Sequence, residues 1–278
     1  MSEVSEMKGE NRIDLFKDVG AAMVKRLSRH KSVVGALFIG GIARGFADKY
    51  SDVDILLFLD HEDAAICPLV RSLAEESENR FSLETDIEVH VLEEYIQQDW
   101  DEYLKSDMSK SVVAFDRHGR LSELLKKKLE VAEEGWQLRI AKLMIYISWY
   151  CFPEKERVPS MIDLWSDRGN PASAQYAVSY TLESIVELLY VLNRCFLPAP
   201  KWRIYNISQL TWLPKNYADA LTDAMLIREI SVEDARRRAR ALAPIWHEML
   251  SRILDEFGMN FQVAQSLYLK EVLHLPAK

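Results

Sequence analysis

The sequence predicts an α+β protein in which a head of mixed strands and helices is followed by an all-helical half. Three apolar runs rich in β-branched and aromatic residues, at 33–39, 53–59 and 85–92, predict strands in the head. After about residue 120 the apolar positions recur almost throughout at helical spacing, and six of the seven tryptophans lie there. Because this change happens once, we expect two domains, 1–120 and 121–278.

Composition narrows the class of protein. The chain has 278 residues, of which 49% are hydrophobic, enough for a sizeable core. It contains no long uncharged apolar run, no secretion-signal pattern at its start, and three scattered cysteines, so we expect a cytoplasmic protein with no membrane segment. The formal charge of −8 argues against nucleic acid as a partner.

The head is expected to contain three helices besides its strands. Apolar side chains recur every three or four positions over residues 11–30, which predicts an amphipathic helix. A second helix is expected over 62–79, although Pro68 must break it or shift its start. A third helix over 93–104 and a short strand at 112–115 complete the head.

The second half is expected to be a helical bundle. We predict one or two helices over 121–150, a long and largely buried helix over 174–196, and a loop at 163–171. A further helix is expected over 232–257, with a kink or break at Pro244. Its four arginines, at 236, 237, 238 and 240, fan around the helix and indicate a solvated surface.

The stretch from Phe38 to Phe58 carries the clearest chemical signal. Asp52 and Asp54 lie two apart on a predicted strand, so their carboxylates share a face roughly 7 Å apart along the strand. Two ionised carboxylates repel unless a cation lies between them, which suggests a divalent metal site. Alone, the pair could merely begin a strand, since aspartate is common in turns. The upstream Gly-Gly-x-Ala-Arg-Gly favours the metal site, because glycine lets backbone N–H groups approach a phosphate.

This stretch resembles the signature of polymerase-β type nucleotidyltransferases, in particular the minimal branch that modifies aminoglycosides and lincosamides. That signature is a hydrophobic residue, Gly, then Gly or Ser, a short loop, and two aspartates that alternate with hydrophobic residues. Here it is Ile39-Gly40-Gly41 and Asp52-Val53-Asp54-Ile55, and Ala43-Arg44-Gly45 and Ser51 inside the loop are also similar to that branch. The resemblance implies a polymerase-β-like head in which Gly40, Gly41, Arg44 and Ser51 hold the triphosphate of ATP or another NTP. It also implies that Asp52 and Asp54 hold two Mg²⁺ ions.

The strand over 85–92 offers a third metal ligand. Its acidic residues and His90 share one face, and a neighbouring strand lies only about 4.8 Å away. Two Mg²⁺ ions about 3.5–4 Å apart need shared oxygen ligands. Glu88 best fits the family pattern as third catalytic acid and metal ligand, and Asp86, two positions away on the same face, is its rival. His90 is expected to be a bystander, because Mg²⁺ prefers oxygen.

Two features of the helical half are candidates for the acceptor and the triphosphate. Glu183 and Glu187 lie four apart and therefore on one helix face, and by the resemblance Glu187 is a candidate general base on the acceptor hydroxyl. A solvated face is the alternative. Lys201 follows two prolines that are expected to hold the chain extended, and is a candidate contact to the triphosphate. Trp202 beside it could stack on a ligand or pack in the core.

The resulting functional prediction is an Mg²⁺-dependent nucleotidyltransferase. We expect it to transfer a nucleoside monophosphate, with AMP from ATP as the expected case, to a hydroxyl of a small acceptor such as an antibiotic. Two alternatives remain: a toxin–antitoxin-type nucleotidyltransferase that modifies a partner protein, and a nucleotide-binding sensor without transfer. The presence of all three carboxylates argues against the sensor.

Overall fold

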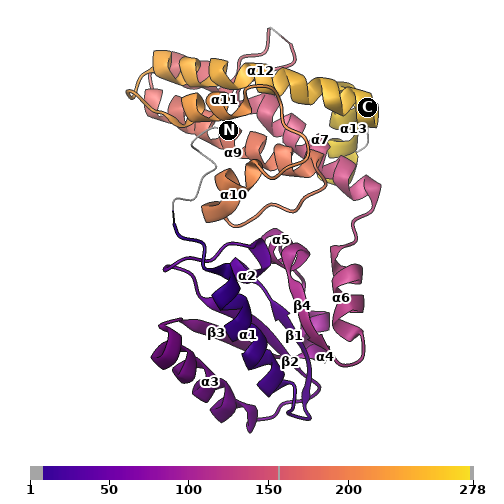
Figure 1. Ribbon diagram of the computed structural model, residues 1–278. Coiled ribbons are helices and arrows are strands. Elements are labelled where there is room, and N and C mark those ends of the chain that lie inside the picture. Colours follow the sequence, from indigo (N-terminus) through magenta and orange to yellow (C-terminus); the bar gives the residue numbers. More distant parts are fainter. Residues whose placement is uncertain (1–8, 156, 276–278) are drawn as a thin grey trace. The chain divides into compact units, whose positions relative to one another are not determined.

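The computed structural model describes residues 9–155 and 157–275. The chain separates into two compact units, one over Met7–Glu130 and one from Val131 onward. The first holds all the strands in the described residues, and the second holds only helices (Figure 1). This confirms the predicted α+β class. The units meet at residue 130 rather than 120, because α6 (Arg120–Leu129) packs against elements of the first unit.

A mixed four-stranded sheet forms the centre of the first unit. Its strands are β1 (Val33–Phe38), β2 (Val53–Leu59), β3 (Thr85–Val91) and β4 (Val112–Asp116), in the order β3-β2-β1-β4. β1 runs antiparallel to both β2 and β4, whereas β2 and β3 are parallel. The parallel pair explains the helical crossover between β2 and β3, since parallel neighbours cannot be joined by a tight turn.

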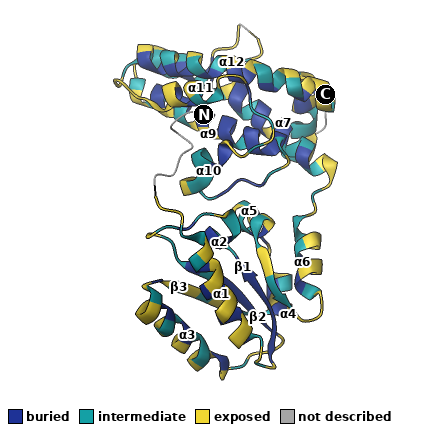
Figure 2. Cartoon of the chain, in the orientation of Figure 1, coloured by how far each residue is buried: buried dark blue, intermediate teal, exposed yellow. Residues whose placement is uncertain are grey.

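One face of the sheet is covered by α1 (Ile13–Leu27) and α3 (Ile66–Phe81). Val53, Ile55 and Leu57 point from β2 into the core under these two helices. Figure 2 shows the buried residues concentrated along β1 and β2 of this unit. The start of α3 is shifted from residue 62 to 66, as the proline at position 68 requires, because it now lies in the first helical turn where backbone N–H groups have no helical partner.

The other face of the sheet is covered by α4 (Leu92–Gln97), α5 (Glu102–Lys110) and α6. Leu56 and Phe58 point from β2 into this second core. The single helix predicted over 93–104 is therefore wrong. The segment divides because Asp101 caps the start of α5, where its side chain accepts a hydrogen bond from the Leu104 N–H group.

The second unit is arranged around its most buried helix, α9, which packs against α7, α8, α10, α11 and α12. The prediction of a long, largely buried helix in this region is thus confirmed. The helices are α7 (Glu133–Tyr150), α8 (Met161–Asp167), α9 (Pro171–Leu192), α10 (Pro200–Ile207), α11 (Tyr217–Met225), α12 (Val232–Phe257) and α13 (Phe261–Glu271).

Two local predictions for this unit are wrong, and a third is narrowed. The segment at 163–171 was expected to be a loop, but most of α8 lies in it, because Ser160 and Asp163 form a capping box. Of the kink or break expected at Pro244, the break is excluded, because α12 continues through the proline as one helix with buried apolar residues on both sides of it. Pro200 begins α10, so Lys201 and Trp202 lie in the first turn of a helix and not in an extended segment.

The arginine run on α12 is only partly solvated, which corrects the prediction of a wholly solvated surface. Arg238 has an exposed fraction of 1%. Its guanidinium donates to the Ala224 carbonyl (2.6 Å), to both oxygens of Gln175 (3.1 and 2.5 Å), and to the Ser179 hydroxyl (2.9 Å). Arg238 thus links α12 to α9 and α11. Across the described residues, none of the helices combines the length and apolarity needed to cross a membrane.

Candidate active site

Asp52 and Asp54 lie at the start of β2, on either side of Val53. Val53 is fully buried in the core under α1 and α3. Because side chains alternate along a strand, Asp52 and Asp54 point to the opposite face of the sheet. Both are only partly buried. The two aspartates of the predicted motif therefore share one accessible face.

The glycine turn that follows β1 positions Asp54. Gly40 has a φ of +58°, and a Cβ atom added to it would overlap the Oδ2 atom of Asp54. The Gly41 N–H group donates a hydrogen bond to the Asp54 carboxylate. Gly40 and Gly41 therefore make room for this carboxylate and orient it. The sequence had suggested a role for them at the phosphate, which stays a prediction.

The surroundings of Asp54 disfavour its negatively charged form. Burial, followed by repulsion from Asp52, raises its pKa to about 7; Arg44 acts in the opposite direction. Asp86 adds further repulsion, and the Gly41 N–H group relieves a smaller part. A partly buried acid with such a pKa lacks sufficient positive charge nearby, and a divalent cation would supply it.

Arg44 lies at the end of α2 (Gly40–Arg44), beside the two aspartates. Burial lowers the pKa of its guanidinium, whereas Asp107, Asp54 and Asp52 raise it. Its NH1 atom is 3.9 Å from Asp107 Oδ1 on α5. The structure thus places Arg44 near both aspartates, and its contact with a triphosphate stays a prediction. It also adds Asp107, which sequence reasoning missed because α5 carries no motif around that residue.

Two acids of β3 lie on the same face as Asp54. In the parallel register Asp86 stands opposite Asp54, and Glu88 stands opposite Leu56. Burial raises the pKa of Asp86, and repulsion from Glu88 and Asp52 adds to it. β3 therefore brings both predicted candidates for the third acid to the correct face, with Asp86 directly across from Asp54.

Glu88 is held by its neighbours on this face. Its Oε2 atom is 3.3 Å from His90 Nε2, and the His90 ring packs against Tyr95, with ring centroids 4.8 Å apart. Burial, and then the charge of Glu88, raise the pKa of Tyr95 to about 12. His90 thus lies within hydrogen-bonding distance of the acid, and its role as a bystander stays a prediction.

The donor set suits a hard cation. Oxygen atoms of carboxylates are the ligands that Mg²⁺ prefers, and the raised pKa values of Asp54 and Asp86 indicate a local excess of negative charge. Within residues 9–155 and 157–275, no three His, Cys, Asp or Glu side chains are gathered closely enough to hold a metal ion as they stand. The chemistry of these donors nevertheless fits Mg²⁺.

Ser51, the remaining predicted residue of the loop, is part of a local turn. Its hydroxyl accepts a hydrogen bond from the Asp48 N–H group (3.0 Å) and donates one to the Asp48 carboxylate (3.3 Å). The Tyr50 N–H group also donates to that carboxylate (2.9 Å). Ser51 therefore shapes the loop before Asp52, and its contact with a triphosphate stays a prediction.

The predicted site residues of the helical half belong to the second unit. Glu183 on α9 forms an ion pair with Arg203 (2.7 Å), and Glu187, one turn later, is half-buried. Lys201 is exposed on α10, with its ammonium 5.9 Å from the ring centroid of Trp202. A base role for Glu187 and a phosphate contact for Lys201 stay predictions.

The first unit thus combines a Gly-Gly turn that orients an aspartate with acids from two neighbouring strands of a mixed sheet. Residues 22–117 match the family model of the nucleotidyltransferase domain. This part of the chain is a nucleotidyltransferase domain of the polymerase-β type superfamily, and the protein is a nucleotidyltransferase.

Comparison with solved structures gives several distant similarities, and two of them are as follows. A nucleotidyltransferase-like protein from Exiguobacterium sibiricum is 14% identical, with a TM-score of 0.40, over 93% of this chain and 79% of that chain. A mutant of the toxin–antitoxin system MntA-HpeT is 11% identical, with a TM-score of 0.29, over 39% of this chain and 83% of that chain. Comparison with curated proteins found no match.

Proposed function

We propose that the protein is an Mg²⁺-dependent nucleotidyltransferase that moves a nucleoside monophosphate, AMP from ATP in the expected case, to a hydroxyl of a small acceptor. The observation that carries this proposal is Asp54. Gly40 and Gly41 fix the carboxylate of Asp54 near Asp52. The pKa of Asp54 is nevertheless raised to about 7. A carboxylate that is held so closely in place, and whose negative charge is balanced by so little positive charge, is typical of a binding group and not of a structural one.

The metal ligands in this proposal are Asp52, Asp54 and Glu88, with Asp86 as the alternative to Glu88. The register favours Asp86 by position, whereas the family pattern and the longer side chain favour Glu88. Bound Mg²⁺ supplies neutralisation of the triphosphate charge and acidification of the acceptor hydroxyl. Gly40 and Gly41 keep the carboxylate of Asp54 in place for this task.

The remaining residues bind and orient the substrates. Arg44, already near both aspartates, offers positive charge to the triphosphate, and the turn at Ser51 shapes the loop that would border it. The acceptor oxygen forms a bond to the α-phosphorus as the bond to the β-phosphate oxygen breaks, and pyrophosphate leaves. Most of the catalysis is then positioning and electrostatics.

The helical unit is proposed to bind the acceptor. There Glu187 would accept the proton of the acceptor hydroxyl, and Lys201 would contact the phosphates. The acceptor class we propose is a small polyhydroxylated molecule, such as an aminoglycoside or lincosamide antibiotic, after the branch that the loop motif resembles.

A transfer assay tests this proposal. Purified protein is incubated with each of the four NTPs, Mg²⁺ and a panel of aminoglycosides and lincosamides, and pyrophosphate release and acceptor mass are measured. We expect one NTP to yield pyrophosphate together with an acceptor that is heavier by one nucleoside monophosphate. The matched variants are Glu187→Gln and Glu183→Gln. Loss of turnover in the first alone supports the base assignment, and full turnover in both removes it.

A further inference from the structure

A pocket lies between α1 and α3, on the face of the sheet opposite the carboxylates. It has a volume of about 380 Å³. Both helices line it with residues three or four positions apart, so each helix gives it one complete stripe. The lining residues are Leu15, Asp18, Val19, Ala22, Met23 and Arg26 of α1, and Leu73, Glu76, Ser77, Arg80 and Phe81 of α3.

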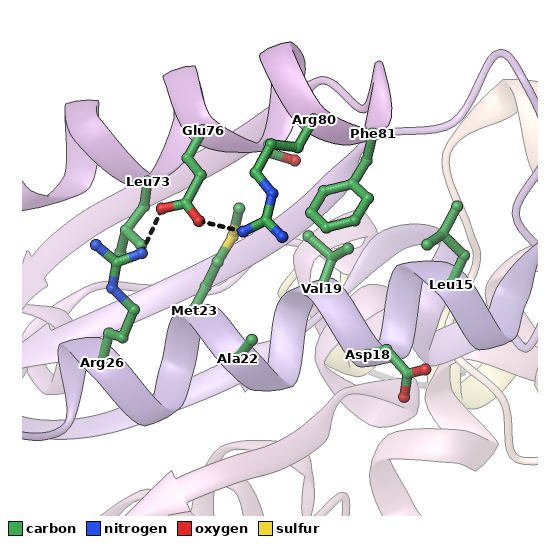
Figure 3. Close-up of a pocket in the computed structure, with 11 residues that line it drawn as sticks. Leu15, Asp18, Val19, Ala22, Met23, Arg26, Leu73, Glu76, Arg80 and Phe81 are labelled. Atoms are coloured by element: carbon green, nitrogen blue, oxygen red, sulfur yellow. Dashed lines mark hydrogen bonds and ion pairs between the residues drawn. The ribbon is translucent and has the colours of Figure 1, made fainter.

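The floor of this pocket is apolar. Figure 3 shows Val19 and Met23 of α1 and Leu73 and Phe81 of α3 directed into the space between the helices. Val19, Met23 and Leu73 are buried residues of the core beneath. An apolar floor of this size suits the hydrocarbon body of a small ligand.

The rim of the pocket carries two arginine side chains, and both form ion pairs with one glutamate. The Glu76 carboxylate accepts from Arg26 NH1 (2.5 Å) on one oxygen and from Arg80 NH1 (2.9 Å) on the other, as Figure 3 shows. Each guanidinium has five N–H donors, so most of those at this rim have no protein partner among the described residues. The carboxylate of Asp18 points away from α3 in this view. The rim therefore favours an anionic group.

We propose that this pocket binds a small amphipathic anion, with an aliphatic body on the apolar floor and a carboxylate at Arg26 and Arg80. The chemical class is a medium-chain carboxylic acid. This site is separate from the proposed active site, since the lining helices cover the other face of the sheet. It stands whether or not the transfer reaction proposed above is correct.

Calorimetric titration of the full chain with decanoate tests the site, with decylammonium as the ligand of equal body and opposite charge. The key variant is Ala22→Trp, which places an indole at the rim of the pocket, and Ala21→Trp is its control, because Ala21 is exposed on the same helix outside the lining. We expect Ala22→Trp to weaken decanoate binding at least about tenfold, equal to 1.4 kcal/mol. Ala21→Trp should leave it unchanged, and decylammonium should bind more weakly than decanoate.

One further comparison tests the arginines. Arg80→Gln should weaken decanoate binding several-fold, whereas Arg71→Gln, an exposed change elsewhere on α3, should not.

Several results would overturn the proposal. Decanoate that fails to bind, or that binds Ala22→Trp as it binds wild type, would exclude the pocket as its site. Equal binding of decylammonium would exclude the role of the arginines. Self-association of the wild type that Ala22→Trp abolishes would show that a second copy of the chain occupies the pocket instead. Anionic vesicles that compete for it equally well would indicate a membrane surface.

Discussion

The two units each contain a buried or partly buried charge, and the two charges are treated in opposite ways. Arg238 in the helical unit is almost fully buried and donates to four oxygen atoms of the protein. Asp54 in the first unit has the Gly41 N–H group and the nearby Arg44, but Asp52 and Asp86 repel it. The protein therefore supplies all the hydrogen-bond acceptors that hold Arg238. It does not supply enough positive charge to balance the carboxylate of Asp54, so we infer that a bound cation does so.

This difference separates a structural charge from a functional one. Removal of a satisfied buried charge leaves its partners without hydrogen bonds and destabilises the fold. Removal of a carboxylate that its neighbours repel removes that repulsion from the folded state, and it also abolishes the binding of any ligand that the carboxylate holds. Substitutions of the two residues should therefore have opposite effects on stability and activity.

The largest effect is expected from Asp54→Asn. We predict a loss of nucleotidyl transfer of at least about 10³-fold, because the variant loses a metal ligand at the reacting phosphate. The same change should leave the melting temperature of the metal-free protein unchanged or higher, since it removes repulsion with Asp52. Turnover and thermal unfolding of one preparation measure both. An active variant would contradict the metal-site assignment.

The third acid should be decided by a matched pair, Glu88→Gln and Asp86→Asn. Each removes one charge on the same face of β3. We predict that Glu88→Gln lowers turnover on the order of 10²-fold or more and that Asp86→Asn has the smaller effect. If Asp86→Asn is the more damaging change, the register and not the family pattern identifies the ligand.

Arg238→Met should act on stability alone. It leaves oxygen atoms of Gln175, Ser179 and Ala224 without a donor, so we predict a loss of about 3 kcal/mol in the free energy of unfolding. Denaturant unfolding of Arg238→Met and of Arg240→Met, an exposed control on the same helix, measures it. An equally stable Arg238→Met protein would show that this network is dispensable.

A further effect is a pH dependence centred on Asp54. Its pKa of about 7 is above the ordinary value, so the folded state binds this proton more tightly than the unfolded state does. The metal-free protein should therefore become more stable as pH falls from about 7 toward 4, with the gain absent in Asp54→Asn. Mg²⁺ affinity should change in the other direction and fall about tenfold per pH unit below 7, because the metal competes with the proton. Calorimetry with Mg²⁺ at pH 6, 7 and 8 checks this.

Much of the first unit could be predicted from the sequence because its signals are local. The strands are short apolar runs between turns, and the glycines and aspartates of the loop stand in a fixed order along the chain. Pairing between strands is different. The register that sets Asp86 opposite Asp54 depends on the path of α3 between β2 and β3, which no short motif records.

The helical unit was harder to predict in detail for the same reason. The burial of Arg238 depends on oxygen atoms about sixty residues away in sequence, at Gln175 and Ser179. The capping box that begins α8 is local, at Ser160 and Asp163, and could have been read from the sequence. Arg44 could be predicted as a site residue from its motif, but its partner Asp107 could not, because only the fold brings α5 beside α2.

The most direct measurement is a calorimetric titration of ATP in the presence and absence of Mg²⁺, with wild type, Asp54→Asn and Asp60→Asn. Asp60 is an exposed acid that directly follows the last residue of β2 and serves as the control. The account predicts Mg²⁺-dependent binding of ATP, or of another NTP tested in the same way, to wild type and Asp60→Asn, and its loss in Asp54→Asn. Nucleotide binding that is indifferent to Mg²⁺ or retained in Asp54→Asn would contradict the claim that Asp54 is left for a metal.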